Sequence, residues 1–575
     1  MRKFLEFLKR NSEKKWFGFA VAVAMAVATI VLPISLGGIK QTADMESHIH
    51  FAQTFRDGIS VGDFYPGWAN DNLGFGSVGI RFYPPVAAFT SAVFELGTGD
   101  WHAAFVSSMF LWMMIGCFGM YLFIREWGSP SLGLFGAVLY AIVPYQIAHI
   151  FRFFLYAEFA SMAAVPFFLL YLTRLLRYGN WRDVAPLALS SSVLILTHIP
   201  VTLMLGFSLL IYVPVAVDLQ RWKKILLQLS CAGALAAAAT AFYWIKIVTE
   251  LLWVAHADQS YTVAGYERGP MLFPYLLVDY DISYEIPFLR HLDIISVLTI
   301  ALLFPAGAVF VSWWKNGKAV GPARVLAAAT CTAAFGIFMF SKPSGFLWAS
   351  VEVLNRLQYP WRWLAVVSAF AVVSLSLSLR FLVEAHLLSK ATAVFGSILL
   401  IFFFAATDIK QIRGMPYRLS PSAFNELAAD VTSQSVATHW WPAWAKADAF
   451  QITERVTSEH PRSLEVTEWK SEQRSFSVGE GEAEDLRVAT FYYPYWHASV
   501  NGREERVGRD ENGAITIPVG REASHVVLRF QKPLTNTIAS SVSAIAWIFL
   551  LGLLASRIAL TGVLSHETND KAAAE

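Results

Sequence analysis

Four polar side chains stand close together at the start of a polar segment, and their types and spacing could support chemistry. Asp44 and His48 are four residues apart, as are Glu46 and His50. On a helix each pair shares one face, and a carboxylate beside an imidazole can act as a base or bind a divalent cation. Two protein ligands are fewer than a metal site usually has. Metal binding by Asp44 and His48 therefore competes with simple surface solvation, and a helix N-cap is the alternative role for Asp44.

Two further charges lie in the aromatic segment HIFRFFLYAEF, which contains Arg152 and Glu158. Charge among apolar residues at membrane depth is costly unless it is paired or hydrated. Arg152 could clamp a phosphate with two hydrogen bonds, and Glu158 could act as an acid, a base or an orienting group. A salt bridge between Arg152 and Glu158 is the structural alternative.

Three more candidates lie at the ends of apolar segments. His198 occurs in LTHIP, Lys246 in YWIK, and Arg362 in LQYPWRWL, where Trp361 and Trp363 flank it. His198 and Lys246 could approach the same substrate cavity, and Arg362 could meet a lipid phosphate. Each has a structural alternative. His198 could be a hydrogen-bonded core residue, and Lys246 could extend its aliphatic chain so that its amine reaches the membrane interface. Arg362 could simply anchor the protein at the interface.

The elements that must position these residues are membrane helices. The chain has 575 residues, of which 55% are hydrophobic and 15% charged, with a mean hydropathy of +0.47. The apolar residues form blocks long enough to cross a bilayer. Lys and Arg occur in short clusters between these blocks, which argues against a nucleic-acid-binding surface. We predict a polytopic α-helical membrane protein with the lipid bilayer as its immediate partner.

The positions of the cations predict the orientation. Six Lys and Arg residues precede the first apolar block, so the N-terminus should be cytoplasmic. The first block is too long for a cleaved signal peptide. The later cationic clusters also lie on the cytoplasmic side if the short segment 86–96 is interfacial or re-entrant and does not cross the membrane. About twelve spans follow, with both termini cytoplasmic in the inner (plasma) membrane: 16–39, 103–124, 132–147, 159–175, 184–198, 201–217, 225–248, 294–313, 323–340, 363–379, 391–407 and 537–556.

The most polar parts of the chain then face away from the cytoplasm. We expect residues 1–407 to form a transmembrane domain with a long outer loop at 40–101. Residues 408–534 form an extracytoplasmic segment, and residues 535–575 hold the last span and a cytoplasmic tail. Within 487–530, runs of β-branched and aromatic residues alternate with turn signals such as Asn501-Gly502. These patterns predict a small C-terminal β-domain.

Other motifs limit the possible functions. Cys117, Cys231 and Cys331 all lie in apolar blocks, so neither a disulfide framework nor a cysteine zinc site is expected. We find no Walker sequence, dinucleotide fingerprint or nucleophile elbow. A carbohydrate-binding role for the β-domain would use tryptophans that stack on sugar rings, although core packing is the commoner role of such residues. The candidates are Trp440, Trp441, Trp444 and Trp496.

In this arrangement the chain resembles the GT-C superfamily of polyprenyl-phosphate-sugar-dependent glycosyltransferases. More closely, it is similar to the bacterial membrane proteins labelled 6-pyruvoyl-tetrahydropterin synthase-related. The resemblance covers nearly the whole chain in order, although each motif is short. The matching elements are Asp44 with His48, Tyr65-Pro66 with Trp68, Gly74 to Gly76, Tyr83 to Pro85, Arg152 with Glu158, Leu196 to His198, Gln358 to Arg362, and the C-terminal Tyr493 to Trp496 pattern.

The resemblance implies an inverting transfer of a sugar from a polyprenyl-phosphate donor to an acceptor glycan, lipid or protein outside the cytoplasm, in envelope polysaccharide biogenesis. Asp44 matches the superfamily's first-loop acid, which assists or orients the acceptor, sometimes with a metal ion. Glu158 matches the approximate place of a second acid, where Asp is usual. Arg152 and Arg362 would neutralise the lipid phosphate. The alternative is a transporter or scaffold of polysaccharide assembly, but the chain shows no internal repeat of the kind common in transporters.

Overall fold

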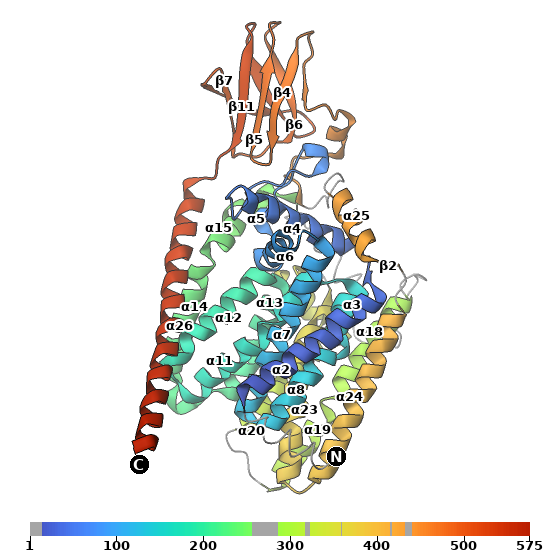
Figure 1. Ribbon diagram of the computed structural model, residues 1–575, viewed down its shortest axis with the longest axis vertical. Helices are drawn as coiled ribbons and strands as arrows, with labels where there is room; N and C mark the ends of the chain where they lie inside the picture. Colours follow the sequence, from blue (N-terminus) through green and yellow to red (C-terminus); the bar gives the residue numbers. More distant parts are fainter. Residues whose placement is uncertain are drawn as a thin grey trace.

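The structure is a computed structural model, described here for residues 14–255, 286–316, 322–357, 359–414, 417–431 and 440–574. A long helical bundle carries a small β-domain at one end (Figure 1). The helix α26 (Leu534–Ala574) runs from the β-domain along the whole bundle. The first described helix begins, and α26 ends, at the bundle end away from the β-domain, as expected if both termini lie on one side of a membrane.

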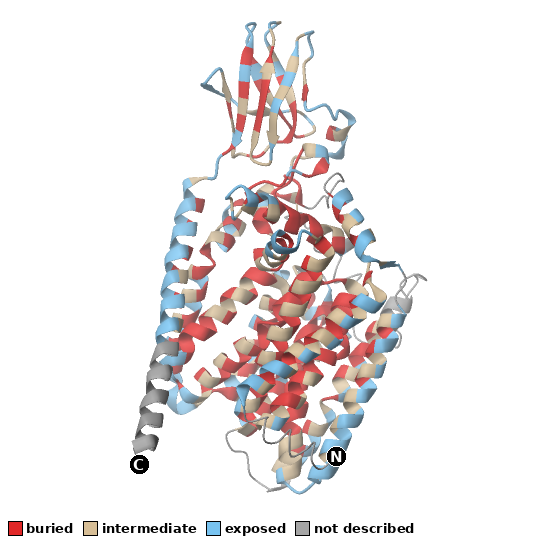
Figure 2. Cartoon of the chain, in the orientation of Figure 1, coloured by how far each residue is buried: buried red, intermediate tan, exposed pale blue. Residues whose placement is uncertain are grey.

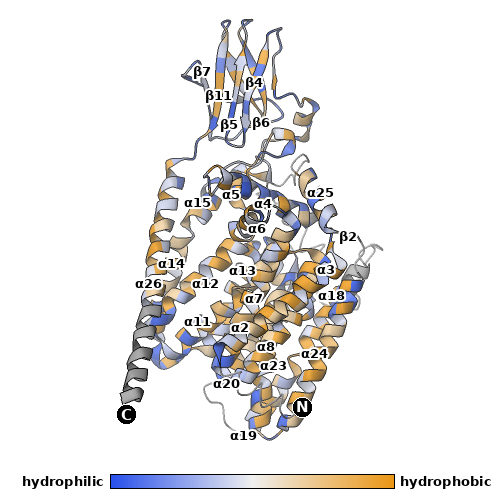
Figure 3. Ribbon diagram, viewed as in Figure 1, coloured by the Kyte–Doolittle hydropathy of each residue, from blue (hydrophilic) through white to orange (hydrophobic). Residues whose placement is uncertain are grey.

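The described residues contain ten helical segments that are long and apolar enough to cross a membrane, or eleven if one bent pair counts as a span. Many residues on their outer faces are apolar, as Figure 3 shows for α24 and α26. Lipid is the solvent that suits such a surface. The ten segments are Lys15–Gly37, Trp101–Trp127, Pro130–Phe153, Tyr156–Tyr178, Ile199–Ala216, His291–Trp313, Pro322–Met339, Pro360–Glu384, Lys390–Arg413 and Leu534–Ser556.

Two of the twelve predicted spans differ from the structure. The helix α12 (Val184–Thr197) has 14 residues, which rise only about 21 Å, and it packs mainly inside the bundle. The predicted span 225–248 breaks at Thr240 into α14 (Trp222–Ala239) and α15 (Ala241–Glu250), and the two parts are bent by 74°. The predicted block at 184–198 is itself shorter than a membrane-spanning helix usually is, whereas a bend without proline leaves no signal in the hydropathy.

The bundle is built from segments that often contain breaks. Its helices are α2 (Lys15–Ala26), α3 (Leu32–Gly37), α4 (Ala43–Ser60), α5 (Gly79–Phe82), α6 (Pro85–Thr98), α7 (Trp101–Trp127), α8 (Pro130–Ile142), α9 (Pro144–Ala148), α10 (Tyr156–Met162), α11 (Val165–Tyr178), α12, α13 (Ile199–Ala216), α14, α15, α18 (Ile286–Ala301), α19 (Phe304–Asn316), α20 (Pro322–Met339), α21 (Gly345–Ser350), α22 (Glu352–Asn355), α23 (Leu364–Glu384), α24 (Lys390–Arg413), α25 (Pro421–Val431) and α26.

The short helix α6 is not among the membrane-crossing segments. It starts at Pro85 and ends at Gly99, whose left-handed φ of 66° stops the helix. In Figure 1 it is seen nearly end-on beside α4, whereas the spans run along the bundle. This agrees with the prediction that 86–96 is interfacial or re-entrant rather than a span.

The polar loop between the first two spans folds against the β-domain. Within it, Asn72 and Leu73 have positive φ, as do Gly74 and Gly76. A Cβ on Gly76 would lie 1.9 Å from Nε1 of Trp68, so only glycine fits this turn. The Asp71 carboxylate accepts hydrogen bonds from Asn72 and Ser77. The loop is therefore an ordered platform under the β-domain.

The β-domain is a two-sheet antiparallel structure, with strand orders β3-β6-β10-β9 and β4-β5-β11-β7-β8. The Asn501-Gly502 turn has φ values of 52° and 78° and joins β7 to β8, as the hairpin signal predicts. A separate pair, β1 (Ile39–Lys40) with β2 (Arg418–Leu419), ties the first span to the segment after α24. The domain strands are β3 (Val456–Thr457), β4 (Leu464–Lys470), β5 (Gln473–Val478), β6 (Glu484–Phe491), β7 (Trp496–Val500), β8 (Arg503–Glu505), β9 (Gly508–Arg509), β10 (Ala514–Val519) and β11 (Ser524–Phe530).

The candidate sugar-stacking tryptophans belong to packed cores. Trp440, Trp441 and Trp496 are buried, and Figure 2 shows the buried interior that continues from the bundle into the β-domain. Trp440 contacts the rings of Phe51 and Tyr83. Trp444 is partly buried, and its Nε1 donates to the Tyr492 carbonyl. These tryptophans therefore pack in the protein core, as the core-packing alternative predicts, and they join the β-domain to the rest of the protein.

Candidate active site

Glu158 lies where a helical path breaks inside the bundle. A π-helical turn, η3 (His149–Phe153), ends at Phe154, which has a left-handed φ of 51°. The helix α10 starts two residues later and places Glu158 in its first turn, where the helix dipole favours a negative charge. The side chain is 1% exposed. The break thus puts a carboxylate inside the protein rather than on its surface.

The two oxygens of Glu158 have different surroundings. Its Oε1 accepts a hydrogen bond from the Tyr145 hydroxyl at 2.9 Å and lies 3.2 Å from Nε2 of His149. Its Oε2 lies 3.7 Å from Nε of Arg362, too far for a hydrogen bond. Within the described part of the chain, neither of these last two atoms has a hydrogen-bond partner. Glu158 is therefore fixed on one side and pairs loosely with Arg362 on the other.

Arg362 lies on the short helix η9 (Pro360–Trp363), directly before α23. It is buried, and its guanidinium stacks 5.8 Å from the Tyr359 ring centroid. The flanking Trp361 and Trp363 are also buried, so they are not membrane anchors exposed at the interface. Gln358 of the same motif lies outside the described residues. A buried cation with one distant carboxylate retains donors for another anion.

Asp44 approaches this pair from α4. It lies in the first turn of that helix and is solvent-exposed. The partial burial of its carboxylate raises its pKa from the ordinary value, Arg362 opposes this shift, and Glu158 adds to it. The preceding Thr42 makes no side-chain cap and instead donates to the Phe153 carbonyl at 3.2 Å. Asp44 is thus a water-accessible carboxylate next to a buried ion pair.

His48 follows one turn later on the same helix and is buried. Its ring packs against Tyr83, Phe154 and Tyr156 at centroid distances of 5.9, 6.2 and 5.5 Å. Burial, with a further contribution from the positive charge of Arg362, lowers the pKa of His48 to about 3. His48 is therefore neutral at physiological pH and cannot act as a general acid there.

The lowered pKa of His48 makes stability depend on pH. The unfolded chain protonates this ring near pH 6.5 but the folded chain only near pH 3, so stability is lost as the pH falls between these values, by about 1.4 kcal/mol per pH unit. The test is the melting temperature in detergent, measured from pH 3 to pH 8. In His48→Phe we expect the fall of the melting temperature at acid pH to begin at a lower pH than in the wild-type protein. The same change at the exposed His460 is the control. Equal profiles for the two variants would contradict this prediction.

His198 joins the cluster at the start of α13. It is the N-cap residue, and its Nδ1 accepts a hydrogen bond from the Val201 backbone at 3.4 Å. The charges of Glu158 and Arg362 both act on it. Asp44, His48, Glu158, His198 and Arg362 thus come together from α4, α10, α13 and the turn before α23.

Two other predicted residues lie elsewhere. Nη1 of Arg152 donates to the Gly414 carbonyl at 3.4 Å, near Lys40, whose pKa is lowered by its burial and by the charge of Arg152. The alternative pairing of Arg152 with Glu158 is wrong, because Arg362 takes that place. Nζ of Lys246 lies 3.6 Å from the ring centroid of Tyr65. Lys246 therefore lies against the first outer loop.

The side chains around Asp44 do not form a complete metal site. Within the described residues, no three His, Cys, Asp or Glu side chains are grouped to hold an ion. Asp44 and His48 share one helix face, but His48 is packed among aromatic rings. Binding of a divalent cation by these two residues stays a prediction, and the chemistry proposed below does not use it.

A comparison with protein families matches residues 80–412 to the model described as "6-pyruvoyl-tetrahydropterin synthase related domain; membrane protein". The match covers more than half of the chain. The chain belongs to this family. The matched residues include Glu158, His198 and Arg362 but not Asp44, His48 or the β-domain, so the family region holds only part of the candidate site. A search of curated proteins returned no match.

The solved structures that match this family member have low sequence identity to it and low TM-scores. The oligosaccharyltransferase of Archaeoglobus fulgidus in its apo form is 12% identical over 76% of this chain and 57% of its own, with a TM-score of 0.38. ArnT from Cupriavidus metallidurans bound to undecaprenyl phosphate is 13% identical over 72% and 75%, with a TM-score of 0.37. Arabinosyltransferase EmbB from Mycobacterium smegmatis is 11% identical over 89% and 62%, also at 0.37. The chain thus spans little more than half of the archaeal protein, and similarities of this size identify no activity.

Sequence reasoning missed Tyr145 and His149 as partners of Glu158. Both precede it in the family region, and Tyr145 directly follows Pro144, which begins α9. Helical periodicity would not place His149 beside a residue nine positions later. The π-turn and the break at Phe154 bring them together. A proline and a histidine within one apolar span, Pro144 and His149, are the sequence signal that could have indicated this break in the helix.

Proposed function

We propose that this protein transfers a sugar from a polyprenyl-phosphate donor to an acceptor on the β-domain side of the membrane. The observation that carries the proposal is the water-accessible Asp44 beside the buried Arg362–Glu158 pair. The resemblance of the motifs around these residues to GT-C glycosyltransferases supports the same reaction class. The acceptor is a glycan, a lipid or a protein.

Each residue has a separate role in the proposed reaction. The acceptor oxygen bonds to the anomeric carbon while the bond from this carbon to the phosphate oxygen breaks, with inversion. The acceptor proton passes to Asp44, whose raised pKa suits a general base. Polyprenyl phosphate leaves with the bonding electrons, and Arg362 stabilises the charge that develops on it. Glu158, held by Tyr145 and His149, positions Arg362 rather than taking the proton.

The distribution of cations supports an orientation with this site outside the cytoplasm. The helix α13 runs from His198 in the site to Ala216 at its other end. There, Arg177 donates to the Ala216 carbonyl and Arg324 to the Val217 carbonyl. Cations gathered at one end of a bundle mark the cytoplasmic side. We therefore propose that both termini are cytoplasmic and that the β-domain is outside, in a plasma membrane.

The proposal is tested by Asp44→Asn, with Glu46→Gln as the matched control. Both residues are acids in the first turn of α4, and the charges of Arg362 and Glu158 act on Asp44. In a strain that lacks the gene, we expect Asp44→Asn to reduce glycan output at least about 100-fold relative to the wild-type chain. Glu46→Gln should restore the output. Expression is checked for each variant.

Binding of undecaprenyl phosphate separates this proposal from the transporter or scaffold alternative. The purified Asp44→Asn protein should still bind that lipid, because Arg362 is intact, while glycan output is lost. Unchanged glycan output with Asp44→Asn would overturn the role of Asp44 as a base. Such a result, together with retained binding of the lipid, would favour a carrier or scaffold.

A further inference from the structure

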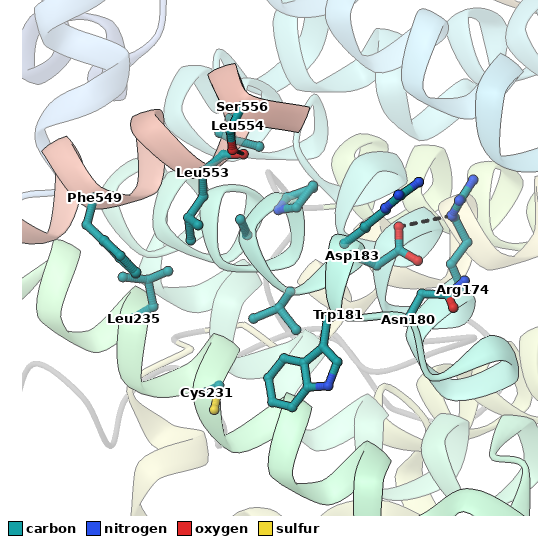
Figure 4. A pocket seen from close by; sticks show the side chains of 14 residues that line it. Arg174, Asn180, Trp181, Asp183, Cys231, Leu235, Phe549, Leu553, Leu554 and Ser556 are labelled. Atoms are coloured by element: carbon teal, nitrogen blue, oxygen red, sulfur yellow. Dashed lines mark hydrogen bonds and ion pairs between the residues drawn. The ribbon is translucent and has the colours of Figure 1, made fainter. Parts of the chain in front are cut away.

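A cavity of about 760 Å³ lies far from the candidate active site, between the α11–α12 turn, α14 and α26. Figure 4 shows polar side chains on one side of it and apolar side chains of α14 and α26 on the other. The polar side includes Arg174, Asn180, Trp181, Arg182 and Asp183. The apolar wall includes Leu235, Phe549, Leu553 and Leu554. The cavity therefore suits an amphipathic ligand.

One cation at the polar side has no internal partner. Nε of Arg174 lies 3.1 Å from Asp183, and its Nη1 lies 3.4 Å from Glu126, so Arg174 already has two carboxylate partners. Arg182 is exposed and forms no ion pair or hydrogen bond with the residues that the structure describes. Among the residues that line the cavity, the two arginines Arg174 and Arg182 exceed the single acid Asp183 by one positive charge, and Arg182 is the unpaired cation that a ligand could meet.

The apolar wall is open to the bilayer. Phe549 on α26 is 58% exposed, and Trp181 at the polar side is 50% exposed. An exposed tryptophan next to a cation is typical of the membrane interface. The turn itself is held in place, because Nε2 of Gln228 on α14 donates to the Gly179 carbonyl at 2.9 Å. A ligand with its chains in the lipid could enter from the side.

We propose that this cavity binds an anionic phospholipid of the bilayer, with its phosphate on Arg182 and an acyl chain between α14 and α26. The turn lies beside the cation cluster at the Ala216 end of α13, whereas the candidate active site lies at the His198 end. A lipid here cannot present its phosphate to Arg362, which argues for a bulk phospholipid rather than a polyprenyl donor. The proposal does not depend on the glycosyltransferase function.

The test uses the delipidated full-length protein in detergent, titrated with phosphatidylglycerol or phosphatidylethanolamine and examined by native mass spectrometry. We expect phosphatidylglycerol to bind more tightly to the wild-type protein. Arg182→Gln should weaken the binding of phosphatidylglycerol about five-fold, as expected for one cation near an anionic headgroup. The binding of phosphatidylethanolamine should stay unchanged. Lys224→Gln, an exposed cation on α14 outside the cavity, is the control. Leu235→Trp should fill the apolar part and reduce binding of both lipids.

Three outcomes would overturn the proposal. Equal binding of the two lipids would exclude recognition of the headgroup charge. An equal effect of Arg182→Gln and Lys224→Gln would show diffuse attraction rather than a site. Displacement of phosphatidylglycerol by an equimolar amount of undecaprenyl phosphate would assign the cavity to a polyprenyl lipid. Melting temperatures confirm that each variant is folded.

Discussion

Replacing Arg81 with methionine is expected to lower the free energy of unfolding by about 3–5 kcal/mol, the usual cost of leaving a buried charge without its partner. Arg81 is fully buried, and its Nη2 lies 2.7 and 2.5 Å from the two carboxylate oxygens of Glu250. Glu250 is also buried and accepts a hydrogen bond from the Tyr493 hydroxyl at 3.1 Å. In Arg81→Met this carboxylate would be left buried without its cation.

The same ion pair joins three parts of the protein. Arg81 belongs to the first loop, Glu250 to α15, and the guanidinium of Arg81 stacks over Tyr495 and Phe530 of the β-domain at 5.3 and 5.6 Å. We therefore expect Arg81→Met to loosen the β-domain as well. Limited proteolysis should cleave the variant faster between bundle and β-domain, in parallel with a lower melting temperature.

Two controls separate a lost ion pair from a lost side chain. Arg503→Met changes an exposed arginine on β8 and should leave the melting temperature unchanged. The double variant Arg81→Met with Glu250→Gln removes both charges and keeps an acceptor for Tyr493, so it should recover most of the loss. A double variant no more stable than Arg81→Met would show that packing around Arg81, not charge, dominates.

The sequence predicted the structure correctly where the backbone conformation depends on residues that are neighbours in the chain. Pro85 and Gly99 mark the ends of α6, and Asn501-Gly502 forms the hairpin it predicts. The shortness of 86–96 predicted a helix that does not cross the membrane, and α6 is not among the membrane-crossing segments of the described residues. In these cases the backbone preference of one or two residues decides the outcome.

Pairing between residues that are far apart in the chain could not be predicted from the sequence in this way. Arg152 and Arg362 both lie among aromatic residues, and nothing local distinguishes the partner of Glu158. Arg152 is six residues from Glu158 in the chain, but the π-turn and the left-handed Phe154 carry it toward Gly414. The bend at Thr240 likewise has no proline or glycine to mark it. These features depend on packing between distant helices.

The buried Arg362 gives the last and largest expected effect on activity. We expect Arg362→Met to reduce glycan output by about 1,000-fold, since removing one group that stabilises developing charge costs about 10²- to 10³-fold. Its buried position lets it act on a phosphate with little competition from water, and Glu158 at 3.7 Å leaves its Nε available. Undecaprenyl phosphate should also bind more weakly to the purified variant.

Arg362 also balances the charge of Glu158, so a structural role must be separated from a chemical one. The double variant Arg362→Met with Glu158→Gln removes both charges and should regain stability, because no buried carboxylate is left without its cation. If Arg362 contacts the phosphate, the double variant stays inactive despite its recovered melting temperature. Recovery of glycan output along with stability would instead show that Arg362 only balances Glu158, and the proposed contact with the donor would be wrong.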